Sequence, residues 1–122
     1  ALTTGQQEAI IGRRKADNVE LADAASGQKA HKTLATITGA DGEEQDILRD
    51  NMPFGSPGTQ MGTYFIGYAR FLEVIEKMLE RMFIGDPPGL HDRILDFSTA
   101  VTGSTFFAPS ADVLASLGGD AG

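Results

Sequence analysis

The sequence contains no cysteine in its 122 residues. This absence excludes a disulfide scaffold, a zinc site built on thiolates and a cysteine nucleophile. It fits a reducing compartment, so we expect a cytoplasmic protein.

Long hydrophobic runs and an excess of positive charge are missing as well. No run approaches the roughly 18 apolar residues that a membrane-spanning helix needs, so no membrane span is expected. Ten basic against seventeen acidic residues give a net charge of −7, which argues against a nucleic-acid-binding surface. The chain starts at Ala1 without the initiator methionine, basic region or apolar region of a leader, which predicts an internal cut or a processed end rather than a targeting signal.

The first part of the chain combines one short helix with a polar segment. Thr3 and Gln6 have the spacing of a capping box, which predicts a helix over residues 6–11 that ends at Gly12. Residues 13–29 are polar and show little periodicity, so we expect a loop there.

Strand patterns occupy the middle of the chain. Residues 32–37 are compatible with a strand, and residues 39–42 (GADG) have the composition of a turn. Residues 46–54 predict a second strand, with Pro53 at its end or on a sheet edge. Residues 62–70 are aromatic and β-branched, and they form the clearest strand pattern of the sequence.

The best helix pattern covers residues 71–83, where apolar side chains recur at helical spacing. Gly85 and the prolines after it predict where this helix ends. Residues 93–99 indicate a further helix or turn, residues 104–109 an extended segment, and residues 112–117 a terminal helix.

These elements predict one α+β domain with helices on one face of an antiparallel sheet. An apolar content of 41% is enough for a single core. Two or three strands are few for an independent sheet, so we expect the fold to be incomplete in this chain.

Neither histidine belongs to a metal or catalytic motif that spacing alone reveals. HExxH, paired-histidine spacing, GxSxG and the Walker loop are all absent. From the pattern alone, His31 and His91 are interpreted as solvated side chains.

Arg49 and Asn51 form the unusual pair of the sequence, because strand periodicity puts both on one face with Ile47. A buried arginine is costly unless it meets an anion or a polar ligand, and Asn51 adds a donor and an acceptor beside it. The pair could therefore hold a small polar reactant. An edge strand with both side chains in water explains the pattern equally well.

Several long runs resemble the C-terminal part of class B dye-decolourising (DyP-type) peroxidases. The resemblance is in register over nearly the whole chain and is weakest between residues 23 and 29. The matching runs are residues 11–15 (IGRRK), 47–55 (ILRDNMPFG), 62–69 (GTYFIGYA), 82–89 (MFIGDPPG) and 91–103 (HDRILDFSTAVTG).

The resemblance implies a ferredoxin-like α+β fold of the dimeric α+β barrel type, with residues 1–122 forming the C-terminal part of the haem-binding domain. It implies haem b as cofactor, hydrogen peroxide and a small aromatic reductant as substrates, and a homo-oligomer. The N-terminal half of the longer protein would then be missing from this chain.

The resemblance also implies roles for single residues. His31 matches the histidine that binds the haem iron, which replaces the interpretation from pattern alone, and Asp92 matches the acid that bonds to that histidine. Arg49 and Asn51 match the distal pocket, where a guanidinium stabilises charge on a departing oxygen. Arg13 is a candidate partner of a haem propionate. Phe65 is a candidate lining of the haem face, and a plain core position explains it equally well.

The family signature that carries a distal aspartate, upstream of the ligand histidine, is absent from this chain. The GADG turn lies after His31 and is too short, so it is not assigned that role. Two alternatives therefore stay open beside the peroxidase. One is a haem-handling protein for iron release or storage, and the other is a fragment without haem that self-associates through open sheet edges.

Overall fold

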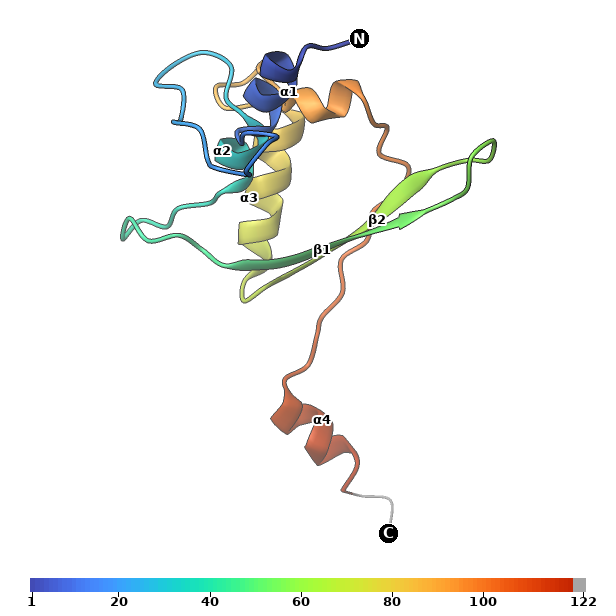
Figure 1. Cartoon of the computed structure of the whole chain (residues 1–122). Coiled ribbons are helices and arrows are strands. Elements are labelled where there is room, and N and C mark those ends of the chain that lie inside the picture. The colour runs from blue at the N-terminus through green and yellow to red at the C-terminus, as the bar shows by residue number, and fades with distance from the viewer. Residues whose placement is uncertain (120–122) are drawn as a thin grey trace.

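The computed structural model describes residues 1–119, and residues 120–122 of the expected 1–122 domain lie outside that part. Helices gather at one end, a long β-hairpin extends from them, and an arm that ends in a last helix leads away (Figure 1). The elements are α1 (Thr4–Ile11), α2 (His31–Ala35), β1 (Ile47–Phe54), β2 (Gly62–Ala69), α3 (Leu72–Phe83), the 3-10 helix η1 (Arg93–Asp96) and α4 (Ala111–Leu117). The predicted α+β class is confirmed.

The hairpin has an inner face that looks toward the helices. β1 and β2 pair antiparallel, with Asn51 opposite Phe65 and Arg49 opposite Gly67. Cross-strand partners and alternate residues share a face, so these four residues lie together. A Cβ at Gly67 would lie 3.4 Å from Cδ1 of Ile75 in α3, which identifies this face as the one that α3 approaches. The expected packing of helices on one face is therefore present.

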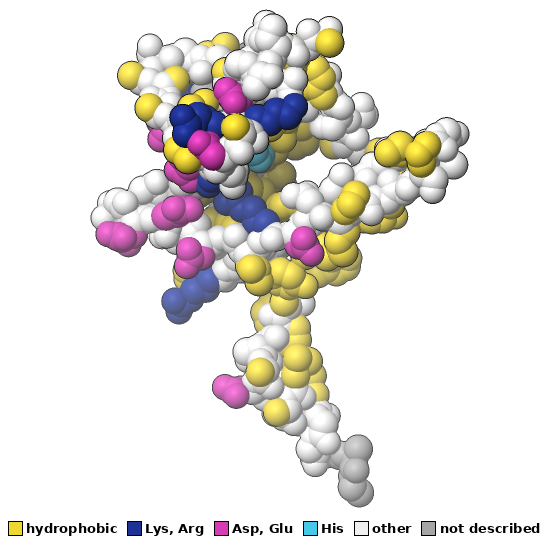
Figure 2. All heavy atoms as spheres, in the orientation of Figure 1, with side chains coloured by type: hydrophobic (Ala, Val, Ile, Leu, Met, Phe, Trp, Pro, Cys, Tyr) yellow, Lys and Arg dark blue, Asp and Glu magenta, His cyan; other side chains and the backbone are white. Residues whose placement is uncertain are grey.

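The outer face of the hairpin carries large apolar side chains that no described element covers (Figure 2). The rings of Phe54 and Tyr64 lie 5.0 Å apart there. Asp50 lies among these apolar side chains, opposite Ile66, and an exposed face that is otherwise apolar usually marks an interaction surface. Its large apolar residues are Leu48, Met52, Phe54, Tyr64, Ile66 and Tyr68.

The core is small and lies between α2, α3 and the start of β1. Met78 is buried at the centre of the apolar stripe of α3, which confirms the helix expected over residues 71–83. Leu34 of α2 is fully buried as well. The packed cluster consists of Ala35, Ile37 and Met78, with Ile47, Val74 and Met82 against it.

The strand expected over residues 32–37 is wrong, because His31–Ala35 form helix α2. Its alternating pattern is too short to separate a strand from a helical turn. Packing against α3 decides the outcome, since the adjacent Leu34 and Ala35 are both buried, whereas a strand would send them to opposite faces. The turn after it is confirmed by the hydrogen bond from Gly42 N to Gly39 O.

Both ends of the chain agree with the sequence in their main features. The capping box of Thr3 and Gln6 is formed, and Gly12 ends α1 with a φ of 91°. Residues 13–29 contain no regular helix or strand. Residues 97–110 likewise contain neither, and the rings of Phe106 and Phe107 are almost completely exposed.

Gly85 is required where α3 turns toward the His91–Asp92 corner. Its φ is +104°, and a Cβ would lie 2.5 Å from the carbonyl carbon of Leu90. Gly89 has a similar φ of +96° but has no atom within 4 Å of an added Cβ, so it is a matched control. We expect Gly85→Ala to lower the free energy of unfolding by about 3 kcal/mol and Gly89→Ala by about 1 kcal/mol. Urea unfolding followed by circular dichroism measures both, and equal losses would contradict the steric argument.

Candidate functional site

The centre of the site is a pair formed by His31 and Asp92. Nδ1 of His31 lies 2.6 Å from Oδ2 of Asp92. The other oxygen of Asp92 accepts a hydrogen bond from the backbone of Ile94 and so caps η1. Asp92 is fully buried, and a buried carboxyl is tolerated when both of its oxygens are satisfied in this way.

The contact with Asp92 determines which ring nitrogen of His31 is available. When Asp92 accepts at Nδ1, the proton is held on Nδ1 and the lone pair of Nε2 is left free. The side chain of His31 is 32% exposed, and within residues 1–119 its ring bonds through Nδ1 alone. A neutral imidazole held in this tautomer is suited to bind a metal through Nε2.

Arg49 approaches the same helix from the inner face of the hairpin. Its Nη2 donates to the backbone oxygen of Ala35, at a distance of 2.9 Å. Ala35 is the last residue of α2 and His31 the first, so one short helix connects the two predicted site residues. A guanidinium has five N–H donors, and this bond uses one of them.

Asn51 and Phe65 lie opposite each other on the inner face of the hairpin. Asn51 lies two residues after Arg49 along β1. Within residues 1–119 the side chain of Asn51 makes no hydrogen bond with another residue, and Phe65 is about half exposed. Arg49, Asn51 and Phe65 therefore share one surface. The structure brings His31 together with Asp92 and links Arg49 to the helix of His31.

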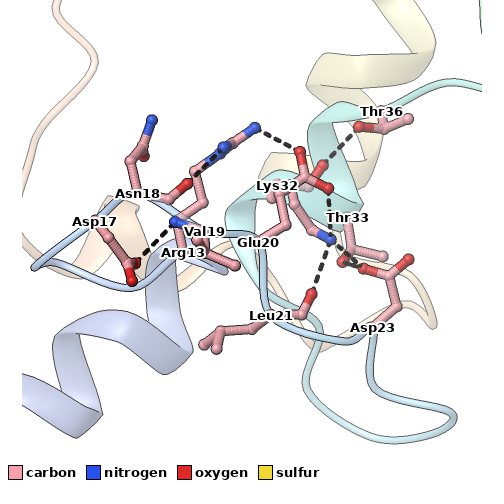
Figure 3. A network of polar contacts seen from close by, with 10 residues as sticks. All are labelled: Arg13, Asp17, Asn18, Val19, Glu20, Leu21, Asp23, Lys32, Thr33 and Thr36. Atoms are coloured by element: carbon pink, nitrogen blue, oxygen red, sulfur yellow. Dashed lines mark hydrogen bonds and ion pairs between the residues drawn. The ribbon is translucent and has the colours of Figure 1, made fainter.

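Arg13 points into its own loop (Figure 3). Its guanidinium donates to Oε1 of Glu20 at 2.5 Å and to the backbone oxygen of Asn18 at 2.9 Å. Next to it, the guanidinium of Arg14 lowers the pKa of Asp17. The contact between Arg13 and a propionate stays a prediction.

Lys32, the residue after His31, connects this loop to α2 (Figure 3). Its ammonium donates to the backbone of Leu21 at 3.0 Å and meets Asp23 at 3.0 Å. The hydroxyl of Thr33 also donates to Asp23, and both hydrogen bonds lower the pKa of that carboxyl. This role of Lys32 leaves no signal in the sequence, since its partners come from a loop without periodicity.

His91 lies outside the central pair. Its Nε2 is 2.7 Å from Oδ1 of Asp96, and Arg93 bonds to the other oxygen of the same carboxylate. The hydrogen bonds from His91 and Arg93 lower the pKa of Asp96. The side chain of His91 is 45% exposed, which agrees with the solvated position expected for it.

The described residues offer an imidazole site rather than a multidentate metal site. Residues 1–119 contain no group of three or more histidine, cysteine, aspartate or glutamate side chains that could hold an ion together. Over the same part of the chain, none of the helices has the length and apolar content for crossing a membrane.

Two residues that bear on the site escaped the sequence analysis: Arg81 of α3 and Asp86 beyond its end. Arg81 bonds to backbone oxygens of α2, and Asp86 meets both Arg81 and Lys29. The available signal was the position of Arg81 three residues after Met78, on the border of the apolar stripe. The backbone partners of such a side chain are set by tertiary packing and leave no pattern in the sequence.

The family described as Dyp-type peroxidase, C-terminal, matches residues 1–113. A dye-decolorizing peroxidase of Mycolicibacterium paratuberculosis is 56% identical over 115 residues, which cover 93% of this chain and 32% of the relative. The dye-decolorizing peroxidase of Mycobacterium tuberculosis is 53% identical, and the match covers 93% of this chain and 34% of that relative. The chain thus spans about a third of the length of these relatives.

Solved structures are similar to the whole fold. A variant of DypB from Rhodococcus jostii RHA1 in complex with heme has a TM-score of 0.84 and 61% identity, covering 95% of this chain and 38% of that one. A dye-decolorizing peroxidase from Bacteroides thetaiotaomicron has a TM-score of 0.82 and 50% identity, and the match covers 97% of this chain and 37% of that one. This likeness confirms the expected ferredoxin-like α+β class.

Proposed function

This chain belongs to the DyP-type peroxidase family, and from that membership we propose that it forms the C-terminal, haem-binding part of a longer peroxidase. That protein would reduce hydrogen peroxide with electrons from a small aromatic donor. The observation that carries the proposal is the hydrogen bond between His31 and the buried Asp92.

The residues present fit haem b as the cofactor. An axial histidine of a haem protein needs one nitrogen for the iron and usually gives the other to a hydrogen-bond acceptor. His31 has this arrangement, with Nδ1 bonded to Asp92 and Nε2 free. The carboxylate fixes the ring and strengthens its donation to a metal, so we assign His31 as the iron ligand and Asp92 as its partner.

Bound haem supplies the redox chemistry of peroxide reduction. For this chain, we propose that Arg49 presents its remaining N–H donors to peroxide and stabilises the negative charge on the departing oxygen. Asn51, which is neutral and can both donate and accept, would orient peroxide or the water that carries its proton. Phe65 would add apolar contact with the haem face, and Arg13 would meet a propionate in exchange for Glu20.

The rest of the longer protein is the proposed partner of the outer face and of the C-terminal arm. The outer face leaves large side chains such as Leu48 and Tyr68 more than half exposed, and Phe106 and Phe107 of the arm are more exposed still. The matched relatives are about three times as long as this chain, which leaves ample protein to cover these surfaces.

One specific observation favours a second candidate function. Within residues 1–119 the sheet has two strands, so the outward edge of each strand is unpaired there, and the outer face is largely apolar. A chain that contained no haem could bury these surfaces by pairing with a second copy. Self-association without catalysis is therefore the alternative to be tested.

Titration with haemin tests the proposal. We expect a Soret band that saturates at one haem per chain, in the purified chain or in the longer protein that the proposal implies, followed by peroxide-dependent oxidation of a dye. A Soret band without dye oxidation would indicate haem handling instead. A colourless oligomer in both preparations would replace the peroxidase by the self-associating alternative.

A further inference from the structure

Helix α2, which begins with His31, is too short to be stable by itself. It contains five residues, and Ala30 at its N-cap provides no side-chain hydrogen bond. Isolated helices of this length are not populated in water, because the free-energy cost of nucleation exceeds the stabilisation from the hydrogen bonds of one or two turns. The orientation of His31 must therefore depend on contacts that α2 makes with other elements.

Arg81 provides such contacts at the carboxyl end of α2. Its Nη1 donates to the backbone oxygen of Thr36 at 2.8 Å, and its Nη2 donates to that of Thr33 at 3.1 Å. The last carbonyls of a helix have no partner within the helix, and a cation there also interacts favourably with the helix dipole. The fork of one guanidinium thus satisfies two carbonyls that the helix itself leaves open.

The same guanidinium reaches the other end of α2 through Asp86. Nη2 of Arg81 lies 3.3 Å from Oδ2 of Asp86, and that oxygen also accepts a hydrogen bond from Nζ of Lys29 at 2.8 Å. Lys29 precedes His31 by two residues. The ammonium of Lys29 lowers the pKa of Asp86, so the carboxylate is charged near neutral pH.

Arg81 is also well shielded from water. Its side chain is 18% exposed, and its Nε is buried with no acceptor among residues 1–119. Charged hydrogen bonds are stronger and less easily exchanged with water in such surroundings. These contacts can therefore hold a fixed geometry, which an exposed ion pair does poorly.

The next residue of α3 fixes the partner of His31. The backbone nitrogen of Asp92 donates to the backbone oxygen of Met82 at 2.7 Å. A single turn of α3 therefore holds α2 through Arg81 and holds Asp92 through Met82. The positions of both His31 and Asp92 therefore depend on contacts with the same helix, α3.

We propose that Arg81 is a positioning residue that sets the orientation of His31 relative to Asp92 by holding both ends of α2. The importance of this orientation for haem rests on the proposed function, but the orientation itself can be measured without haem. Arg81 touches neither the imidazole nor the proposed substrates. It acts through the backbone of α2 and through Asp86.

The test compares Arg81→Met with the wild type in the complete 122-residue chain without haem. Nitrogen-15 spectra of the histidine rings report the tautomer, and hydrogen exchange reports the amides of Leu34 and Ala35. We expect the ring signals of His31 to move toward a mixture of tautomers and the two amides to exchange at least tenfold faster. The ring signals of His91, which bonds to Asp96 instead, should stay in place and report an intact fold.

Lys77→Met is the matched control. Lys77 lies one turn before Arg81 on α3 and is 60% exposed, and its one ion pair within residues 1–119 is with the carboxylate of Glu80, at 3.8 Å. The Lys77→Met substitution removes one positive charge from α3, as Arg81→Met does, and we expect the signals of His31 to remain unchanged. If Arg81→Met disturbs His91 as well, Arg81→Lys becomes the deciding variant, because it keeps the charge and loses the fork. Unchanged His31 signals in the deciding variant would overturn the proposal.

Failure of this inference and failure of the proposed function give different results. Loss of haem in a His31→Ala variant, together with unchanged His31 signals in the Arg81 variants, would remove the role of Arg81 only. Shifted His31 signals in Arg81→Met, with no haem binding by the wild type, would support the positioning role of Arg81 and contradict the proposed haem function.

Discussion

We expect replacement of His31 by alanine to abolish the Soret band proposed for the protein with haemin. His31 provides the free Nε2 of the site, and its Nδ1 is held by Asp92. Even the loss of a hydrogen-bond partner behind a metal ligand costs about 10–100-fold in affinity, so the loss of the ligand itself should cost at least about 100-fold. Haemin titration followed by absorbance measures the change directly.

His91→Ala is the control for this variant, because it removes an imidazole from a carboxylate pair outside the site. His91 bonds to Asp96 near the surface, at 2.7 Å. We expect the wild-type Soret band and affinity in this variant. A His31→Ala protein that bound haemin with the wild-type spectrum and affinity would show that another residue binds the iron.

We expect replacement of Arg49 by leucine to leave haem bound but to slow the proposed reaction with hydrogen peroxide. A preorganised donor that stabilises developing negative charge is commonly worth about 100–1000-fold in rate, and we expect a loss in this range. Stopped-flow recording of the Soret region after mixing with peroxide measures the second-order rate constant. The affinity for haemin should change by no more than a few-fold.

The affinity measurement matters because Arg49 also has a structural contact. Its Nη2 donates to Ala35 at the end of α2, so leucine could act through that helix instead of through peroxide. Arg70→Leu is the matched control, since Arg70 lies just after β2, is exposed and stacks on the ring of Phe71 at 5.3 Å. Wild-type rates are expected for Arg70→Leu. A wild-type rate in Arg49→Leu would contradict a role of Arg49 in the peroxide reaction. A large loss of haem affinity would show that Arg49 acts by holding α2.

Elements with strong local signals were predictable from the sequence. The capping box at Thr3 and Gln6 and the glycine at position 12 fix the two ends of α1 through backbone hydrogen bonds between near neighbours. The apolar stripe of α3 follows from the period of the helix, and the aromatic and β-branched residues of β2 favour a strand. In these cases the determining interactions are close in sequence or repeat with a fixed period.

Helix α2 shows where such prediction fails. Five residues contain too little periodicity to decide between helix and strand, and the pattern favoured the wrong alternative. The helix depends on Leu34 packing in the core and on Arg49 and Arg81 bonding to its carbonyls from elements far along the chain. The residues of the candidate site were predicted by another route, because the resemblance over long matching runs named His31, Asp92, Arg49 and Asn51.

By itself, the sequence determined the hairpin, the long helix, the absence of thiolate chemistry and the residues on each strand face, because all of these depend on composition or on a local period. Only the tertiary structure decided that His31 starts a helix, that Asp92 is buried against it, and that Arg81 and Asp86 hold that helix at both ends. These contacts join segments about 50 to 60 residues apart in the sequence. Their geometry comes from the packing of α2 on α3 and of the η1 corner beside them, which no local pattern encodes.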